Sequence, residues 1–386
     1  MIAETQASEP MKFNYVIVGS GLTGAVFARL LTDAGESVVV LDRRVHLGGN
    51  VADEQHSSGI RIHTYGPHYF RTVSDSVWQF VNRFSHFHPY RHQVKSLVDG
   101  RLENWPIAES YIRRVCGDDW RPAITDSQPD NFEDAALSLM PRVIYEKFVK
   151  GYTEKQWGVP ARKLAAQLCK RFDVRHDDNP LLTPKAKHQG IPADGYTAMM
   201  RRMLDGIPLR LGVDYLSHRE EFRPRKLLIF TGPIDEYFDY EIGELAYRGQ
   251  RRETTYVAEA GFVHPSAQIN NPGDGAHIRD IEWKHLMPLR AASSANGTVI
   301  TRETPFSPDD PQHYEYPFPD EINRTGFRAY QGLAEDEPGV LICGRLGEYR
   351  YFDMDHAIAR AMELCKRILT RSQQPGELTK DWVATS

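Results

Sequence analysis

The feature that most constrains this chain is the glycine motif Gly-Ser-Gly-Leu-Thr-Gly at residues 19–24. It follows an apolar run at 15–18, typical of a buried parallel strand, and it opens a segment with helical spacing at 22–34. A second buried strand is predicted at 37–41. Strand, turn, helix and strand fit within about 30 residues, which predicts one βαβ unit of the Rossmann type.

Each glycine of the motif has its own physical reason. Gly19 permits the tight turn, Gly21 lets the backbone approach a pyrophosphate, and Gly24 allows close packing of helix against strand. The amides of the helix N-terminus then face the phosphate charge. Asp42 ends the second predicted strand, where its carboxylate can accept a hydrogen bond from a ribose hydroxyl. We predict that these four residues bind a dinucleotide; a purely structural glycine turn is the alternative.

A second pair of glycines follows the acidic residue, in the string RRVHLGGN at 43–50. FAD-dependent oxidase-like proteins carry a basic residue and a Gly-Gly turn at this point, and the resemblance favours FAD over NAD. Arg43, Gly49 and Asn50 are therefore candidate FAD-binding residues. The alternative is that the Gly-Gly pair is only a mobile loop.

The pattern of apolar residues changes after this βαβ unit. Apolar residues fall at helical intervals over 75–178 and strands are scarce there, which predicts a mostly helical insertion. From about 207 the chain has short β-like runs, such as 226–230 and 298–301. A buried strand at 340–342 precedes a helical run at 357–368.

The fold class we predict is α/β, with a discontinuous Rossmann-type FAD-binding core, an inserted helical domain and an antiparallel β-sheet domain. The predicted boundaries are 11–74 for the core, continued at about 190–240 and 335–372, 75–178 for the helical domain, 179–334 for the sheet and substrate-binding segments, and 373–386 for a C-terminal tail.

Composition limits the partners that the chain can have. The 386 residues carry a formal net charge of -5, so no basic surface points to nucleic acid or to an anionic membrane. No run approaches the roughly 18 apolar residues of a membrane span, and the first ten residues do not resemble a signal peptide. The four cysteines form no CxxC pair, as expected of free thiols in a reducing compartment. We therefore expect a cytoplasmic protein. We also expect no metal site, since HExxH and Cys/His ligand clusters are absent from the sequence.

Six later strings resemble the UDP-galactopyranose mutase family, in family order and over nearly the whole chain. They are HTYGPHYFRT (63–72), KGYTEKQWG (150–158), KRFDVR (170–175), QGIPADGYTAM (189–199), FTGPIDEYF (230–238) and GRLGEYRYFDMD (344–355). The resemblance implies an isomerase that interconverts the pyranose and furanose forms of a nucleotide sugar, such as UDP-galactopyranose and UDP-galactofuranose. It implies that N5 of reduced FAD acts as the nucleophile at the anomeric carbon, with no net redox change. NAD(P)H or another reductant would reduce the flavin, and a homodimer is plausible.

Such a reaction needs cations around a diphosphate that leaves and returns. The resemblance assigns Arg175 and Arg279 to that diphosphate, and guanidinium groups suit it because they bind phosphate bidentately. It also places Tyr349 and, with a weaker match, Tyr316 there, since phenols donate to phosphate without adding charge. The predicted catalytic set is His68 with both arginines and Tyr349. Surface charges and core aromatics are the structural alternatives.

The resemblance also assigns the substrate side of the site. Tyr152, with Phe148 four residues earlier, matches the uridine site, where a base stacks on an aromatic ring. Trp157 matches the tryptophan beside the sugar, and Asn270 fits the family pattern. We expect Phe148 and Tyr152 to share a helix face, with core packing as the alternative.

The flavin ring has its own candidates. His68 matches the family and His63 lies close in sequence; either imidazole can hydrogen-bond flavin or sugar, although a lone histidine is more often structural. Arg345, Asp353 and Met354 belong to a further FAD-contacting segment, in which the GRLG string should run beneath the isoalloxazine. Asp353 could equally be only a helix cap.

The family pattern is broken at three places. The usual H-x-F-H reads HYFR at 68–71, PLLTPK at 180–185 lacks the Tyr-Phe pair of the mobile substrate loop, and a PGDG turn at 272–275 precedes Arg279. These changes fall where base and sugar should sit, which suggests the same chemistry on an altered nucleotide sugar. Two alternatives share the N-terminal fingerprint: an FAD-dependent amine oxidase or desaturase-like oxidoreductase, and a non-enzymatic flavin protein that senses redox state.

Overall fold

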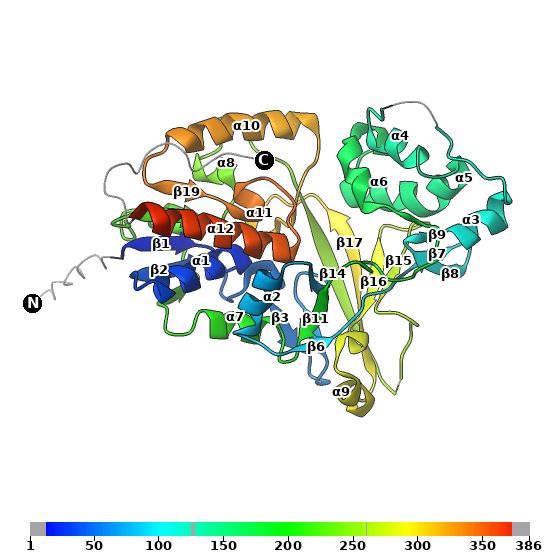
Figure 1. The fold of residues 1–386 in the computed structure, drawn as a ribbon, viewed down its shortest axis with the longest axis horizontal. Coiled ribbons are helices and arrows are strands. Elements are labelled where there is room, and N and C mark those ends of the chain that lie inside the picture. Colours follow the sequence, from blue (N-terminus) through cyan, green and yellow to red (C-terminus); the bar gives the residue numbers. More distant parts are fainter. Residues whose placement is uncertain (1–12, 125–127, 260, 373–386) are drawn as a thin grey trace, which may run out of the picture. The chain divides into compact units, whose positions relative to one another are not determined.

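The computed structural model describes residues 13–124, 128–259 and 261–372. The chain forms two compact units, each assembled from segments far apart in the sequence (Figure 1). The first unit contains the described residues of Met1–Gly49, Met200–Glu244 and Phe327–Ser386, and the second contains those of Asn50–Met199 and Leu245–Gly326. The predicted tail at 373–386 and the first ten residues lie outside the described ranges.

The first unit is built on a parallel sheet of five strands in the order β12-β2-β1-β13-β19. Its strands are β1 (Tyr15–Val18), β2 (Val38–Asp42), β12 (Leu209–Leu211), β13 (Leu227–Phe230) and β19 (Val340–Ile342). Strands β1, β2 and β13 are buried at every residue, as apolar strands covered on both faces should be. The predicted Rossmann-type core is therefore confirmed.

Two long helices pack side by side in this unit, α1 (Leu22–Asp33) and α12 (Met354–Ser372) (Figure 1). Helix α1 buries small and apolar side chains, among them Ala25, Phe27 and Leu31. Helices α8 (Ile234–Tyr237) and α11 (Gly344–Gly347) and a 3-10 turn at Tyr215–Ser217 also belong to this unit. Helices α7 (Tyr196–Met203) and α10 (Glu321–Asp336) and a 3-10 turn at Gly49–Val51 each have residues in both units.

The second unit contains a seven-stranded sheet in the order β18-β14-β17-β16-β15-β7-β8. Its strands are β7 (Val94–Val98), β8 (Arg101–Trp105), β14 (Tyr247–Val257), β15 (Gln268–Asn270), β16 (Arg279–Glu282), β17 (Thr298–Phe306) and β18 (Tyr316–Pro317). All neighbouring strands are antiparallel except β15 and β7. Three small sheets accompany it: β5 (Phe70–Thr72) with β11 (His188–Pro192) and β6 (Phe87–Pro89), β3 (Asp53–Gln55) with β4 (Arg61–His63), and β9 (Ile107–Ala108) with β10 (Val174–Arg175).

Helices of this unit enclose a core of their own, which includes Phe132, Ile144, Tyr145 and Phe148. They are α3 (Glu109–Cys116), α4 (Phe132–Leu137), α5 (Arg142–Tyr145), a π-helical segment at Glu146–Lys150 and α6 (Gly151–Trp157). The unit also contains α2 (Asp75–Asn82) and α9 (Leu289–Ser294), which contribute no residue to this core. Short 3-10 turns lie at Ala161–Lys163, Ala166–Arg171, Trp283–Leu286 and Pro311–His313.

The segment 75–178 differs from the mostly helical insertion that we expect there. It holds strands β6 to β10 as well as the helices, and β7 and β8 form one edge of the large sheet. Strand β7 buries Val94, Ser96 and Val98 in alternation, a period-two pattern too short to stand out from the surrounding helical spacing. Residues 50–74 belong to the second compact unit and not to the first. Within the described ranges, no helix is both long enough and apolar enough to cross a membrane.

Candidate functional site

Two glycine turns meet backbone to backbone in the first unit. A β-carbon on Gly24 would lie 2.0 Å from the carbonyl oxygen of Gly19, and one on Gly49 would lie 2.9 Å from the Cα of Gly21. Gly19 itself has a φ of 104°, which strains any other residue. Gly21 is the N-cap of α1 and has no side chain to cap it. The first turn of α1 is thus shaped to receive a phosphate in place of a capping side chain.

Asp42 holds this turn in shape. Its Oδ2 accepts hydrogen bonds from the Ser20 amide at 2.8 Å and the Ser20 hydroxyl at 2.6 Å, and its Oδ1 accepts from the Arg44 amide at 2.9 Å. A carboxylate can accept about four hydrogen bonds, so a ribose hydroxyl remains possible as a further donor. The role of Asp42 toward a ribose stays a prediction.

Arg43 is paired within the protein. Its guanidinium donates to both carboxylate oxygens of Glu236, at 2.7 and 2.8 Å, and lies 3.9 Å from Asp214. Burial would lower the pKa of Arg43, but these carboxylates outweigh it and raise the pKa above its ordinary value. Arg43 therefore ties the end of β2 to α8, which sequence reasoning did not foresee.

The predicted flavin-contacting segment lies around α11 and the start of α12. Arg345 donates to the carbonyl of Phe352 at 2.7 Å and stacks over Tyr351. The Asp353 carbonyl accepts from Ala357 at 3.0 Å just before Met354 opens α12. Asp353 thus stands at a helix N-terminus, as both of its predicted roles require.

Tyr349 belongs to the same segment and has a backbone conformation that is rare for a tyrosine. Its φ is 42°, in the left-handed region, which costs a residue with a β-carbon roughly 1–2 kcal/mol. Its ring stacks on Phe327 at 5.8 Å between centroids, and only 8% of the residue is exposed. Strained residues are held in place by their surroundings and are frequent at functional sites, so the prediction for Tyr349 is retained.

A polar row crosses five strands of the second unit. In strand register, Ser96 lies opposite Asn270, Asn270 opposite Arg279, Arg279 opposite Glu303, and Glu303 opposite Arg252. Directly opposite residues point to the same face of a sheet, so these side chains form a continuous line. Asn270 also accepts from Gln268 at 2.8 Å.

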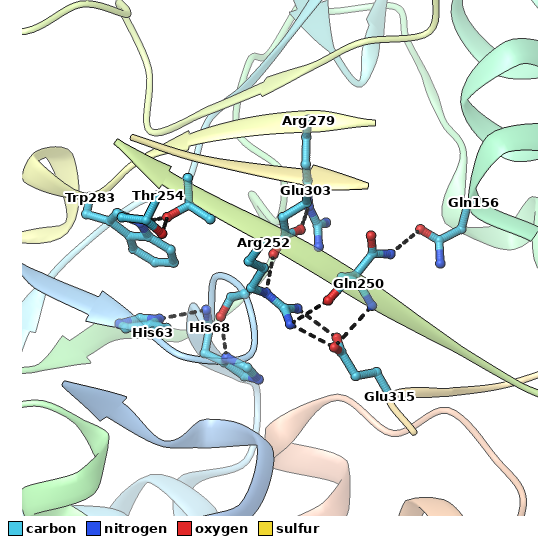
Figure 2. Close-up of polar contacts among 12 residues, drawn as sticks. His63, His68, Gln156, Gln250, Arg252, Thr254, Arg279, Trp283, Glu303 and Glu315 are labelled. Atoms are coloured by element: carbon cyan, nitrogen blue, oxygen red, sulfur yellow. Dashed lines mark hydrogen bonds and ion pairs between the residues drawn. The ribbon is translucent and has the colours of Figure 1, made fainter. Parts of the chain in front are cut away.

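Three of these residues form an ionic ladder that ends on Glu315 (Figure 2). The Glu303 carboxylate pairs with Nε of Arg279 and, at 2.9 Å, with Nε of Arg252. Both terminal nitrogens of Arg252 then reach Glu315 at 2.8 Å. Burial would raise the pKa of the inaccessible Glu303, but the two guanidinium groups hold it below its ordinary value. Glu303 is therefore held as a carboxylate between the two guanidinium groups.

Arg279 is the member of the ladder that meets the predicted substrate residues. Burial would lower its pKa, but Glu303 raises it well above the ordinary value, with smaller contributions from Tyr152 and Tyr316. Tyr316 lies on β18 and Tyr152 on α6, so three separate elements converge. Tyr152 and Tyr316 thus lie near enough to Arg279 to act on its charge, and the roles of all three toward a substrate stay predictions.

Arg175 is placed differently. It lies on β10 in the two-stranded β9–β10 sheet, not in the polar row. It pairs with Asp173 at 2.6 Å and donates to the Leu182 carbonyl at 3.3 Å. The latter contact connects it to the 180–185 segment, where the sequence departs from the family.

Phe148 and Tyr152, which we expect on one helix face, differ in their burial. Phe148 is 1% exposed and packs edge-to-face on Tyr111, with 5.0 Å between centroids, inside the helical core. Tyr152 is only partly buried. Phe148 lies in the π-helical segment just before α6, and its ring is part of the helical core, whereas the Tyr152 residue keeps some exposure. Trp157, the last residue of α6, is 8% exposed and meets Phe318 edge-to-face.

Lysine 155 ties α6 to the divergent turn at 271–277. The Lys155 ammonium donates to the carbonyls of Asn271 at 2.6 Å, Gly273 at 2.8 Å and His277 at 3.0 Å. Sequence reasoning missed this lysine because its three acceptors are backbone atoms more than a hundred positions away.

The two predicted histidines differ in character. His63 is 3% exposed between Trp283 and Tyr196, and burial with the nearby charge of Arg61 lowers its pKa to about 3. The imidazole of His63 is therefore neutral at physiological pH and serves packing. His68 lies half-buried, with Nδ1 2.7 Å from the Gly66 carbonyl.

Tyr69 is a further residue that sequence reasoning did not assign. Its hydroxyl oxygen is buried and has no hydrogen-bond partner among the described residues. Burial raises the pKa of Tyr69 well above its ordinary value, and the charges of Arg279 and Glu303 act on it. An orphaned hydroxyl beside the ladder is satisfied if a ligand group bonds to it.

Among the described residues, no group of three His, Cys, Asp or Glu could hold a metal ion.

The sheet and its glycine turns define the class of the protein, a Rossmann-like dinucleotide-binding fold. A family model for an NAD(P)-binding Rossmann-like domain matches residues 17–84. The chain superposes on a crystal structure of reduced UDP-galactopyranose mutase with a TM-score of 0.75 at 15% identity, covering 94% of this chain and 95% of the other. A putrescine oxidase matches with a TM-score of 0.60 at 10% identity, over 94% of this chain and all of the other, and shows the fold alone.

The family model described as UDP-galactopyranose mutase matches residues 147–351, more than half of the chain. A probable UDP-galactopyranose mutase of Klebsiella pneumoniae is 34% identical over 92% of this chain and 95% of its own length. A dTDP-fucopyranose mutase of Escherichia coli is 32% identical over 93% of this chain and 99% of its own length. The chain belongs to the UDP-galactopyranose mutase family and is an isomerase of the mutase type.

Proposed function

We propose that the protein interconverts the pyranose and furanose forms of a nucleotide sugar, with reduced FAD bound in the first unit and no net redox change. The observation that carries the proposal is Arg279, a guanidinium held permanently charged beside Tyr152 and Tyr316. Such a group can retain a nucleoside diphosphate while its bond to the sugar is broken and remade.

The first unit has features that fit FAD. The glycine turns at Gly19–Gly24 and Gly48–Gly49 leave room that a β-carbon would fill, and the N-terminus of α1 can bind the pyrophosphate. Asp42, Asn50, Arg345 and the residues that open α12 would complete the site. When bound, reduced FAD would supply the nucleophile at the anomeric carbon.

The protein's own residues then have three tasks. Arg279 and Arg175 would bind the diphosphate as it leaves and returns, because a charge-assisted contact is stronger toward the more charged leaving group. Tyr316 and Tyr349 would donate to its oxygens. Tyr152 would stack on the nucleobase and Trp157 would border the sugar.

The nucleotide sugar is UDP-galactopyranose or a related molecule. One similar protein is named for UDP-galactopyranose and another for dTDP-fucopyranose, so both chemistries occur among relatives. The orphaned hydroxyl of Tyr69 lies in the divergent HYFR string and supports an altered sugar contact. We expect a hydroxyl-bearing substrate to be preferred over one that lacks that group, since a buried donor left unpaired is costly.

A substrate screen tests the proposal. Purified protein, either oxidised or reduced with dithionite, is incubated with UDP-galactopyranose and with dTDP-fucopyranose, and the products are separated by chromatography. We expect furanose product only from reduced protein. Equal furanose formation by oxidised protein would contradict the role of reduced FAD. Oxygen consumption with an amine substrate and no ring exchange would replace the mutase with the oxidase alternative. Repeating the assay with NAD(P)H tests the proposed reductant.

A further inference from the structure

We propose that Arg252 and Glu315 are positioning residues for Arg279, which they hold ready for the diphosphate through the shared carboxylate of Glu303. The inference rests on the proposed function, because it takes Arg279 as a diphosphate ligand. Neither Arg252 nor Glu315 needs to touch the substrate.

The two arginines of the ladder are used in opposite ways. All three nitrogens of Arg252 are engaged: Nε donates to Glu303, one terminal nitrogen donates to both Glu315 and the Gln250 carbonyl, and the other donates to Glu315. Arg279 donates its hydrogen bond to Glu303 through Nε, and within the described residues its two terminal nitrogens make no hydrogen bond. The terminal face of Arg279 is the part that a phosphate can bind bidentately.

Sharing of Glu303 keeps that face open. One oxygen of Glu303 faces Arg279 and the other faces Arg252. A carboxylate freed from Arg252 could turn both oxygens onto Arg279 in the fork-to-fork geometry that Arg–carboxylate pairs favour. Glu303 would then compete with the diphosphate for the same nitrogens.

Glu315 anchors the far end of the ladder and also carries the next candidate ligand. Its carboxylate accepts from Arg252 and from the Gln250 amide at 3.3 Å, and its own amide donates to the Arg248 carbonyl at 3.1 Å. Tyr316 follows directly on β18. One anchored residue thus fixes both the ladder that aims Arg279 and the backbone that carries Tyr316.

The intact ladder is closely surrounded by protein. Glu303 is 0% exposed as a side chain, Glu315 5% and the two arginines 14% each. A β-carbon on Gly66 would lie 2.6 Å from Glu303 Oε1 and 3.1 Å from a terminal nitrogen of Arg252, so the neighbouring loop closes on the ladder. Removing one partner of a buried ion pair leaves an uncompensated buried charge, which is strongly destabilising. A substitution at Arg252 or Glu315 should therefore shift Glu303 and, with it, the Arg279 side chain.

The test uses Arg252→Met and Glu315→Gln in the 386-residue protein with its flavin bound, and UDP and uridine are the binding probes in calorimetric titrations. We expect the Kd for UDP to rise about tenfold or more in both variants, while the Kd for uridine stays within about twofold, because only the diphosphate contacts Arg279. Arg252→Lys keeps the positive charge and should therefore recover part of the affinity for UDP. The recovery should be incomplete, because one ammonium cannot bridge both carboxylates as a guanidinium does.

The control is a matched ion pair on the same two strands. Asp280 and Arg302 are opposite each other in register, next to Arg279 and Glu303, and pair at 2.9 and 3.0 Å with Arg302 half exposed. Asp280→Asn should leave UDP binding unchanged. Flavin content and thermal unfolding are measured for every variant, and Glu315→Gln, the milder change, decides the matter if Arg252→Met does not fold.

The outcomes separate the two proposals. If both variants bind UDP as the unmodified protein does, or lose UDP and uridine equally, the positioning role is refuted even when mutase activity is present. If the unmodified protein binds UDP and the variants lose it selectively but no ring exchange occurs, the positioning role stands and the proposed function falls. Failure of the unmodified protein to bind either UDP or dTDP would overturn both.

Discussion

Nδ1 of His63 accepts a hydrogen bond from the backbone amide of His68 at 3.0 Å. This bond requires that Nδ1 carries no proton, and the ring is enclosed by Trp283 and Tyr196. The imidazole of His63 is therefore neutral and supports the loop that carries His68. Because the folded protein disfavours its protonation, the free energy of unfolding should fall as the pH is lowered.

His63→Asn should flatten the acid limb of the stability profile. The pKa of His63 lies at about 3 in the folded protein against 6.5 ordinarily, so between these values the unfolded chain binds a proton that the folded chain does not. Stability from this group is complete above pH 6.5 and falls below it by up to about 1.4 kcal/mol per pH unit. Urea unfolding from pH 4.5 to 7.5 measures the slope. The exposed His313→Asn serves as control, and an unchanged slope in His63→Asn would contradict the assignment.

Gly24→Ala should abolish flavin binding. The added methyl group would lie 2.0 Å from the Gly19 carbonyl oxygen, so the turn must open. Gly332→Ala is the matched control, because its β-carbon meets nothing within 4 Å on the exposed side of α10 and should stabilise the helix by about 0.5–1 kcal/mol. Flavin absorbance after gel filtration reports the difference. Normal flavin content in Gly24→Ala would show that the turn is not the cofactor site.

Phe148→Ala and Tyr152→Ala should fail in different ways. Phe148 is a core residue, so its truncation should cost about 3–5 kcal/mol of stability. Tyr152→Ala should weaken nucleotide-sugar binding by roughly 1–3 kcal/mol, the range measured for base stacking on aromatic rings, with a smaller loss of stability. Thermal unfolding and KM are measured side by side. A larger KM effect from Phe148 than from Tyr152 would restore Phe148 to the uridine site.

Arg175→Ala should abolish turnover and leave the yellow flavin bound. Arg175 lies in the β9–β10 sheet of the second unit, whereas the glycine turns lie in the first. Arg114→Ala removes an exposed arginine that pairs with Glu103 and should be neutral. Reduced-enzyme assays and flavin spectra give both readouts. Loss of flavin together with activity would mean that Arg175 supports the fold and does not bind the diphosphate.

Lys155→Met should loosen the divergent turn before Arg279. Three carbonyl acceptors lose their donor at once, at a cost of about 1–3 kcal/mol each if they are left unsatisfied, so the turn must shift toward water. We expect a lower melting temperature and a higher KM. The exposed Lys163→Met should change neither. A variant with normal stability but impaired binding would show that Lys155 contacts the substrate itself.

The sequence predicted the first unit well because its signals are local. Strands at 15–18 and 37–41 and the glycine turn between them are set by burial, φ and backbone clearance within a few residues, and the structure places β1, α1 and β2 there within one residue at the strand ends. The segment 75–178 was predicted less well, since β7 and β8 are stabilised by distant neighbours such as β15. Short strands whose partners are remote leave little local trace.

Local chemistry in the sequence determined the parallel α/β core and the glycine turns of a Rossmann-like fold, because turn geometry depends on adjacent residues. Only the tertiary structure decided which charges work together. Arg252 and Glu303 look like ordinary strand charges until the register of β14, β16 and β17 aligns them with Arg279, and Glu315 joins them through Arg252. Electrostatic coupling depends on distance through space and on burial, and neither can be read from positions tens of residues apart along the chain.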